Sequence, residues 1–146
     1  MQLKLDIAST VKKVASALQQ NGKNISREMA NVLVTVMSER IFEEGKAANG
    51  GAIGTYNNKY LKLREKKYKR LEGSKVVVSL TRKLENNFSV VEAGDYYGIG
   101  VNNSKDADKM KWVEQHFNKH IATGLTQAES DLLAEASVHI IDRYLK

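Results

Sequence analysis

Residues 88–101, FSVVEAGDYYGIGV, decide the fold class of this 146-residue chain because their apolar residues follow the pattern of two short strands. Phe88-Ser89-Val90-Val91 predicts one strand, and Tyr97-Gly98-Ile99-Gly100-Val101 alternates with the period of two that marks a second. Ala93-Gly94-Asp95 lies between them and is typical of a tight turn. The sequence therefore predicts an antiparallel hairpin.

The segment before the hairpin extends the predicted sheet region to residues 75–102. The β-branched run Val76-Val77-Val78 predicts a further strand, and Thr81–Asn87 predicts a short helical turn that its first residue could cap. Gly98 and Gly100 fall on one face of their strand. We therefore expect another element, most simply a packed helix, to approach that backbone closely.

Two helices are predicted after the hairpin, over residues 103–146. Asn103 or Ser104 opens the first helix, and the capping box Thr126-Gln127-Ala128-Glu129 begins the second. Apolar residues at helical spacing give the second helix a core face. These residues are Leu132, Leu133, Ala136, Ile140, Ile141 and Tyr144.

Two helices are also predicted at the amino-terminal end, over about residues 5–45. The first is amphipathic and ends at Asn21-Gly22. Its apolar stripe consists of Ile7, Val11, Val14 and Leu18. The second begins near Asn24 or Ser26, either of which can serve as an N-cap, and stops at Gly45.

Together these elements predict an α+β fold, in which a small antiparallel β-sheet packs against N-terminal and C-terminal α-helices. The length favours one domain over residues 1–146, since the chain is too short for two ordinary domains. Residues 46–58 are rich in glycine and have no periodicity. Together with the basic residues that follow, they predict a long loop or arm over residues 46–75.

The basic arm, residues 59–75, reads KYLKLREKKYKRLEGSK and contains eight basic and two acidic residues. The whole chain has 23 basic and 17 acidic residues, so the arm holds its entire net charge of +6. Its partial helical stripe and its run of like charges predict disorder in the free monomer. The candidate contact residues are Lys59, Lys62, Arg64, Lys66, Lys67, Lys69, Arg70 and Lys75.

Two interpretations of this arm remain open from the residues alone. Tyr60 and Tyr68 interleave with the basic residues, a pattern compatible with phosphate contact and base stacking. Alternatively, the arm is solvated and its charges pair with an acidic neighbouring protein.

The sequence gives no indication of an enzyme, a cofactor or a metal site. There is no cysteine, and no carboxylates converge as an acid and a base would. His116 and His120 stand four residues apart, but Phe117 occupies the place where a metalloprotease helix has glutamate. The start of the chain lacks the apolar core of a signal peptide, and no apolar run is long enough to span a membrane. These features predict a protein of the cytoplasm.

Three blocks of sequence carry a resemblance to a known family. Ile41–Gly45 followed by Ile53–Tyr56, then Val78–Thr81 with Leu84 and Phe88, and then residues 99–117, come in the order found in tail-completion (virion morphogenesis, neck) proteins of long-tailed bacteriophages. This chain departs from the family pattern at three positions, Ala52, Arg82 and Asn87. The motif positions with a structural role are Phe42, Gly45, Gly54, Tyr56, Leu80, Thr81, Leu84 and Phe88.

The resemblance implies a structural virion protein that forms a ring, with a hexamer as the family expectation. Such a ring completes the head-proximal end of the tail and joins it to the head, after assembly in the host cytoplasm. Neighbouring neck, adaptor or tail-tube proteins are the implied partners, with possible contact to DNA in the channel and none to a membrane. The alternative hypothesis is a small cytoplasmic nucleic-acid-binding protein that uses residues 59–75.

Overall fold

The structure of the chain is a computed structural model that describes residues 7–70, 73–78 and 82–146. Over these ranges the chain forms five α-helices, one π-helix and a two-stranded antiparallel sheet, so the predicted α+β class is confirmed. The elements are α1 (Ile7–Ser38), η1 (Glu39–Glu44), α2 (Asn58–Tyr68), α3 (Lys83–Asn87), β1 (Phe88–Ala93), β2 (Tyr96–Val101), α4 (Ser104–Phe117) and α5 (Gln127–Leu145).

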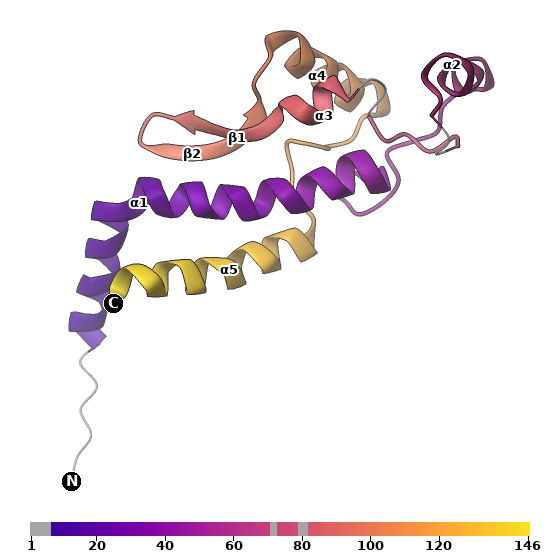
Figure 1. Ribbon diagram of the computed structural model, residues 1–146. Helices are drawn as coiled ribbons and strands as arrows, with labels where there is room; N and C mark the ends of the chain where they lie inside the picture. The colour runs from indigo at the N-terminus through magenta and orange to yellow at the C-terminus, as the bar shows by residue number, and fades with distance from the viewer. Residues whose placement is uncertain (1–6, 71–72, 79–81) are drawn as a thin grey trace.

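The long helix α1 runs through the middle of the molecule (Figure 1). The β1–β2 hairpin packs on one side of α1, and α5 packs on the other. Helices α3 and α4 lie in the same layer as the hairpin, and α2 stands at one end of the molecule, far from the first turns of α1. Both the sheet and α5 therefore depend on α1 for the burial of their apolar faces.

The predicted hairpin is confirmed with its turn. Phe88 pairs with Val101 and Ala93 pairs with Tyr96, which leaves the two-residue loop Gly94-Asp95. Gly94 has a φ of 65°, a left-handed conformation that glycine adopts without strain. Ser26 on α1 fixes the hairpin to the helix, because its hydroxyl oxygen accepts a hydrogen bond of 2.8 Å from the backbone N–H of Tyr97.

The expected close approach to the strand glycines is wrong. A β-carbon built on Gly98 would meet no atom within 4 Å, and one built on Gly100 would meet only Val91 of the paired strand, at 3.3 Å. Between the two glycines, Ile99 packs against the core. Because neighbouring strand residues point to opposite faces, the glycines lie on the face away from the core.

The predicted strand at Val76–Val78 is also wrong. These residues lie outside the β1–β2 sheet and run beside residues 54–56, where the N–H of Val76 donates to the carbonyl of Gly54 at 3.2 Å. Val76 and Val77 are fully buried, which explains their apolar character. Val78 then adopts a left-handed φ of 53°, so the chain turns before a ladder can form.

The predicted break at Asn21-Gly22 is wrong as well, because α1 continues through it. A single glycine inside a helix costs only about 1 kcal/mol, which tertiary packing readily offsets. Ser26 does not act as an N-cap, since its hydroxyl donates to the carbonyl of Lys23 within the same helix. The break is replaced by a bend, and the indigo segment of α1 turns away from the rest of the helix (Figure 1).

The predicted helix end at Gly45 is confirmed. Before it, the backbone widens into the π-helix η1, and three consecutive residues, Arg40, Ile41 and Phe42, are buried there. Gly45 has a φ of 65°, and a β-carbon at this position would stand 2.3 Å from the carbonyl oxygen of Val76. Only glycine satisfies both the left-handed turn and this close approach.

The first part of the predicted loop, residues 46–56, is tightly folded rather than loose. Ala47 donates to the carbonyl of Gly51 at 2.8 Å, Ala48 donates to that of His120 at 2.8 Å, and Ala47 is fully buried. The Lys119 ammonium group also donates to two carbonyls of this segment. The exposed glycines Gly50 and Gly51 thus form a tight turn at the surface while Ala47 and Ile53 on either side are buried.

Arg40 connects this loop to the start of α5. Its guanidinium is 5% exposed and donates through Nε to the Glu129 carboxylate at 2.7 Å. It also donates to the carbonyl oxygens of Lys46, Ile121 and Gly124 at 3.0–3.1 Å. Glu129 in turn belongs to the predicted capping box with Thr126, which is confirmed.

The buried core gathers residues from α1, η1, the glycine-rich loop, the Val76–Val78 segment, α3, β1, α4 and the α4–α5 connection. Phe42 and Phe88 meet edge to face with ring centroids 5.7 Å apart. The core residues are Met37, Ile41, Phe42, Ala47, Ile53, Val76, Leu84, Phe88, Met110 and Ile121. The capping predicted for Asn103 is also confirmed, since its side chain accepts from the backbone N–H groups of Lys105 and Asp106.

Substitution of Gly54 by alanine should lower the free energy of unfolding by about 1–3 kcal/mol, the usual cost of overpacking a filled core. The added β-carbon would lie 2.5 Å from the Phe117 ring. Gly98→Ala is the matched control, because its β-carbon meets nothing within 4 Å. Urea unfolding measures both, and equal stabilities of the two variants would contradict the packing described here.

Candidate functional site

Residues 58–68, most of which belong to the basic arm, form the helix α2, so the loop predicted over residues 46–75 is wrong in this part. Asn57 caps the helix, because its side chain accepts from the backbone N–H of Tyr60 at 2.8 Å. Lys66 and Lys67 lie in the last turn, where cations interact favourably with the helix dipole. Lys69 ends the helix in a left-handed conformation.

Arg64 differs from the other predicted contact residues because it is only 1% exposed. Its guanidinium lies 4.3 Å from the ring centroid of Tyr56 and 5.7 Å from that of Tyr60. The two rings themselves meet edge to face at 5.1 Å. Arg64 therefore attaches α2 to the rest of the protein through cation–π contacts.

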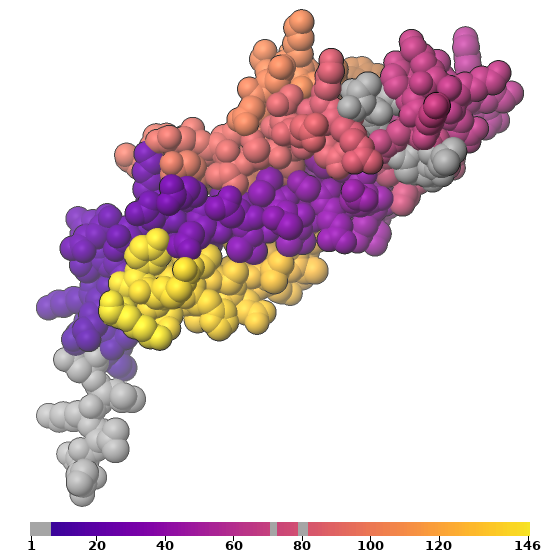
Figure 2. All heavy atoms as spheres, viewed as in Figure 1, coloured from indigo at the N-terminus to yellow at the C-terminus, as the bar shows by residue number. Residues whose placement is uncertain are grey.

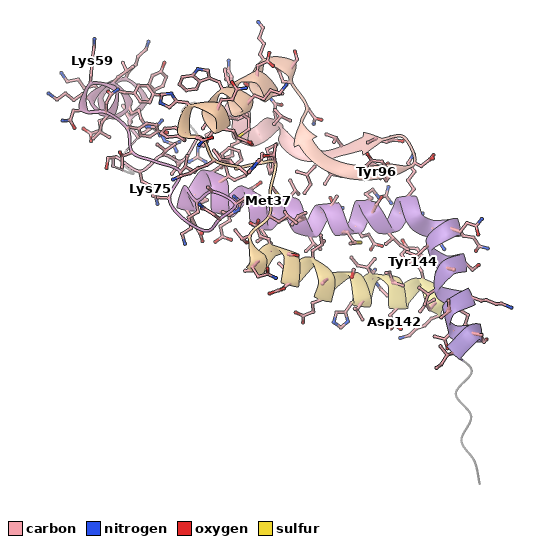
Figure 3. All side chains as sticks on the ribbon, turned by 180° about the vertical axis from the view of Figure 1, so that it is seen from behind. Met37, Lys59, Lys75, Tyr96, Asp142 and Tyr144 are labelled. Atoms are coloured by element: carbon pink, nitrogen blue, oxygen red, sulfur yellow. The ribbon has the colours of Figure 1, made fainter. Side chains whose placement is uncertain are left out.

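Among the remaining predicted residues, the exposed lysines on and beside α2 form a basic surface, which we call the lysine face: Lys59, Lys62, Lys66, Lys67 and Lys69. Lys75 is exposed outside α2, where its ammonium group donates to the carbonyl of Glu43 at 3.4 Å, and Arg70 is half-buried. Figure 3 shows Lys59 at the end of the molecule opposite Tyr144 and Asp142. Tyr60, Arg64 and Tyr68 repeat every four residues, a signal that could have separated the buried cation from the exposed ones.

A cleft of about 860 Å³ lies between α2, the Val76–Val78 segment and α4. We call it the α2–α4 cleft. Its floor is apolar, and aromatic rings from both helices stand around it. The lining residues on the two walls include Tyr56, Tyr60, Arg64, Tyr68, Leu84, Lys109, Trp112, Val113, His116 and Phe117.

Trp112 is the residue of this cleft that sequence reasoning missed. It is 59% exposed, and its ring stacks on His116 with centroids 4.8 Å apart and planes 13° apart. His116 in turn meets Phe117 edge to face at 4.8 Å. The four-residue spacing of Trp112 and His116 places both rings on one face of α4, so the spacing was a usable signal.

The cleft is cationic. Arg82, Lys83 and Lys109 contribute to its lining together with the buried Arg64. Among the described residues that line it there is no aspartate or glutamate. Lys109 pairs with Asp106 at 3.3 Å, and Asp106 itself is held by the side-chain amide of Asn87. The lining therefore favours an anionic ligand with flat or apolar groups.

The residues predicted as family-motif positions lie mainly in the core. Phe42, Leu84 and Phe88 are buried, Gly45 and Gly54 allow close approaches, and Tyr56 lines the α2–α4 cleft. Leu80 and Thr81 lie outside the described residues.

The two histidines considered for a metal site have other contacts. His116 stacks on Trp112, whereas His120 lies beyond the end of α4 and its Nδ1 is 2.9 Å from the Thr123 hydroxyl. Over residues 7–70, 73–78 and 82–146, no group of three or more potential ligand residues could hold a metal ion. In the same ranges no helix is long and apolar enough to cross a membrane.

No family model, curated protein or solved structure matches this chain.

Replacement of Arg64, the buried cation, should detach α2 from the rest of the protein while the core stays folded. For Arg64→Ala we expect hydrogen exchange of residues 58–68 to become at least tenfold faster, because the cation–π contacts to Tyr56 and Tyr60 are lost. Lys62→Ala removes the same charge from an exposed position and should leave the exchange unchanged. Equal exchange rates in the two variants would contradict the anchoring role.

We expect ionisation of the Tyr56 hydroxyl to lower the stability of the folded protein at high pH. Burial raises the pKa of Tyr56 above its ordinary value of 10.0, although Arg64 acts in the opposite direction. The folded protein therefore favours the neutral phenol. This contribution is fully present below pH 10 and is lost as the pH rises through the folded pKa. The unfolding free energy of Tyr56→Phe should consequently fall less steeply above pH 10 than that of the wild type.

Urea unfolding at several pH values from 8 to 12 measures this difference. Parallel curves for the two proteins would show that ionisation of Tyr56 is not linked to folding.

Proposed function

We propose that this chain is a structural protein of a long-tailed bacteriophage virion, which forms a ring that completes the head-proximal end of the tail and joins it to the head. The observation that carries the proposal is the ordered set of sequence blocks around Phe42, Gly54 and Phe88. A hexamer in the neck is the expected assembly, with adaptor or tail-tube proteins as neighbours.

The packing of these blocks supports the proposal because they act as one unit. Phe42 and Phe88 are 46 positions apart in sequence, yet their rings are in contact. Gly54 lies against Phe117, and Gly45 lies against the backbone of Val76. The blocks that carry the resemblance therefore contribute to one shared core.

The large surface of the chain also favours assembly. Its accessible area is 10034 Å², whereas a compact monomer of 16.3 kDa exposes about 7,500 Å². Even if counted as unfolded chain, the eleven residues outside the described ranges account for only about 1,800 Å². Figure 2 shows the elongated outline, with α2 forming one end. Such a shape offers extensive surface for contacts with other subunits.

Apolar side chains are exposed at the end opposite α2. Ile7, Val11 and Leu18 on α1 are 70%, 60% and 44% exposed, and Val138 on α5 is 66% exposed. The three α1 residues share one helical face, the stripe expected from sequence, but in this chain the stripe is largely uncovered. Exposed apolar residues gathered in this way typically mark a protein contact.

A contact between this end of one copy and a different surface of the next would be heterologous. Contacts of this kind close into rings when the rotation between copies permits. The lysine face at the other end is then available to an acidic neighbouring protein, with electrostatic attraction guiding the encounter. No residue in this scheme performs catalysis, and the proposed role is assembly.

The purified protein should form closed rings of fixed copy number, six by expectation, in native mass spectrometry and negative-stain images at micromolar concentration.

The double variant Val11→Gln with Leu18→Gln should weaken assembly at least tenfold, because it removes apolar contact area. Lys12→Gln with Lys13→Gln on the same helix is the matched control. Antibodies to the chain should label the head–tail junction of purified virions.

A protein that stays monomeric up to 100 μM and is absent from virions would overturn the proposed function. Rings that form equally well from the apolar double variant would exclude the α1 stripe as the subunit contact.

A further inference from the structure

We propose that the α2–α4 cleft binds single-stranded nucleic acid, DNA or RNA, by stacking a base on Trp112 and holding phosphates with the surrounding cations. The inference rests on the geometry of the cleft and does not depend on the proposed ring. The cleft borders the core through Val76 and Leu84, but the exposed stripe on α1 does not line it.

Trp112 presents an exposed indole ring at the cleft. Large aromatic side chains are highly buried on average, but Trp112 is 59% exposed at the cleft. Its ring is nearly parallel to that of His116, and His116 is braced by Phe117. One face of the indole is thereby supported, which pre-organises the ring as a platform. Stacking of a base on such a platform is worth about 1–3 kcal/mol.

The opposite wall supplies further rings. Tyr60 and Tyr68 from α2 line the cleft, and the Arg64 guanidinium beside Tyr60 fixes the orientation of that wall. Aromatic rings on two walls suit successive flat bases, because every base has a π face whatever its sequence. We therefore expect little discrimination among bases.

The cleft also carries positive charge. Arg82, Lys83 and Lys109 line the cleft, and no aspartate or glutamate of the described residues lines it, although Lys109 is paired with Asp106 beside it. The lysine face continues the positive charge along α2. Within the described ranges, Lys59, Lys62 and Lys66 have no ion-pair partner, so their ammonium groups are available to phosphates.

The stacking requirement selects single strands over duplex. In a duplex each base is stacked between its neighbours and cannot stack on a protein ring such as Trp112 unless it is flipped out. An acidic peptide would use the cations but would have no need of a planar, exposed indole. The combination of aromatic platform and cations therefore favours single-stranded nucleic acid over both.

Trp112 is the sole tryptophan of the chain, so its fluorescence reports directly on the cleft. Titration with a 12-nucleotide oligothymidylate should quench the emission saturably. The affinity should fall with salt, with a slope of about −0.7 for each phosphate contacted. Oligouridylate of equal length distinguishes DNA preference from RNA preference. The 12-base-pair duplex and polyglutamate of similar charge should bind at least tenfold more weakly.

Variants are compared by the anisotropy of labelled oligothymidylate, because the tryptophan signal is lost in one of them. Trp112→Ala should weaken binding about 5- to 150-fold, the range equivalent to one stacked base. Tyr96→Ala is the matched control, since Tyr96 is 60% exposed but lies on the hairpin, away from α2 (Figure 3). Lys109→Gln alters a 63% exposed side chain and should reduce the salt slope by about 0.7.

Three outcomes would overturn the proposal. Duplex binding as tight as that of the single strand would exclude stacking, and tighter binding of polyglutamate would assign the cleft to an acidic protein. If the folded Trp112→Ala variant bound the oligonucleotide with unchanged affinity, Trp112 would not be the stacking platform. If that variant does not fold, an unchanged salt slope in Lys109→Gln decides against the cleft in the same way.

Discussion

The buried ion pair between Arg40 and Glu129 is the interaction on which the rest of the fold depends. Burial of a charge is strongly unfavourable unless its hydrogen-bonding groups are satisfied. Arg40 meets this condition with one carboxylate and three carbonyl oxygens, which come from separate segments of the chain. Those segments must all be in place for the guanidinium to be buried. The pair therefore specifies one arrangement of the glycine-rich loop, the α4–α5 connection and α5.

The α2–α4 cleft follows from this arrangement in two steps. With the glycine-rich loop fixed, Gly54 lies against Phe117 and so positions α4 beside residues 54–56. Tyr56 then presents its ring to Arg64, whose burial holds α2 opposite α4. Each step depends on a close approach or a buried cation. The two walls of the cleft are thus joined through the core, although α2 stands at the end of the molecule.

The features that sequence could predict are those encoded within a few residues. The Gly94-Asp95 turn, the Thr126 capping box and the helix end at Gly45 each satisfy backbone groups locally, so short patterns identify them. The break expected at Gly22 failed for the opposite reason, because packing along α1 outweighs a weak local preference. The strand predicted from the β-branched run at Val76 was also wrong, because β-branched residues suit a buried core segment as well as a paired strand.

The site was predicted only in part, because net charge does not show which cations are exposed. The sequence places Arg64 among eight similar basic residues, and only its contacts with Tyr56 and Tyr60 distinguish it. Trp112 lies 48 positions further along the chain, and no local pattern connects it to α2. The four-residue spacing of Trp112 and His116 could be read from the sequence. Its significance depends on α2, which forms the opposite wall of the cleft.

The basic arm therefore has two physical roles that its composition does not separate. Arg64 is structural, because its charge is satisfied by aromatic faces inside the protein and is withdrawn from solvent. The lysine face is a surface whose charges remain solvated and can be exchanged between partners at little cost. A ring through which duplex DNA must slide requires weak, exchangeable phosphate contacts rather than tight clamps. Solvated lysines around a cleft that accepts unstacked bases would satisfy that requirement, so the proposed assembly role and the proposed single-strand site are compatible in one subunit.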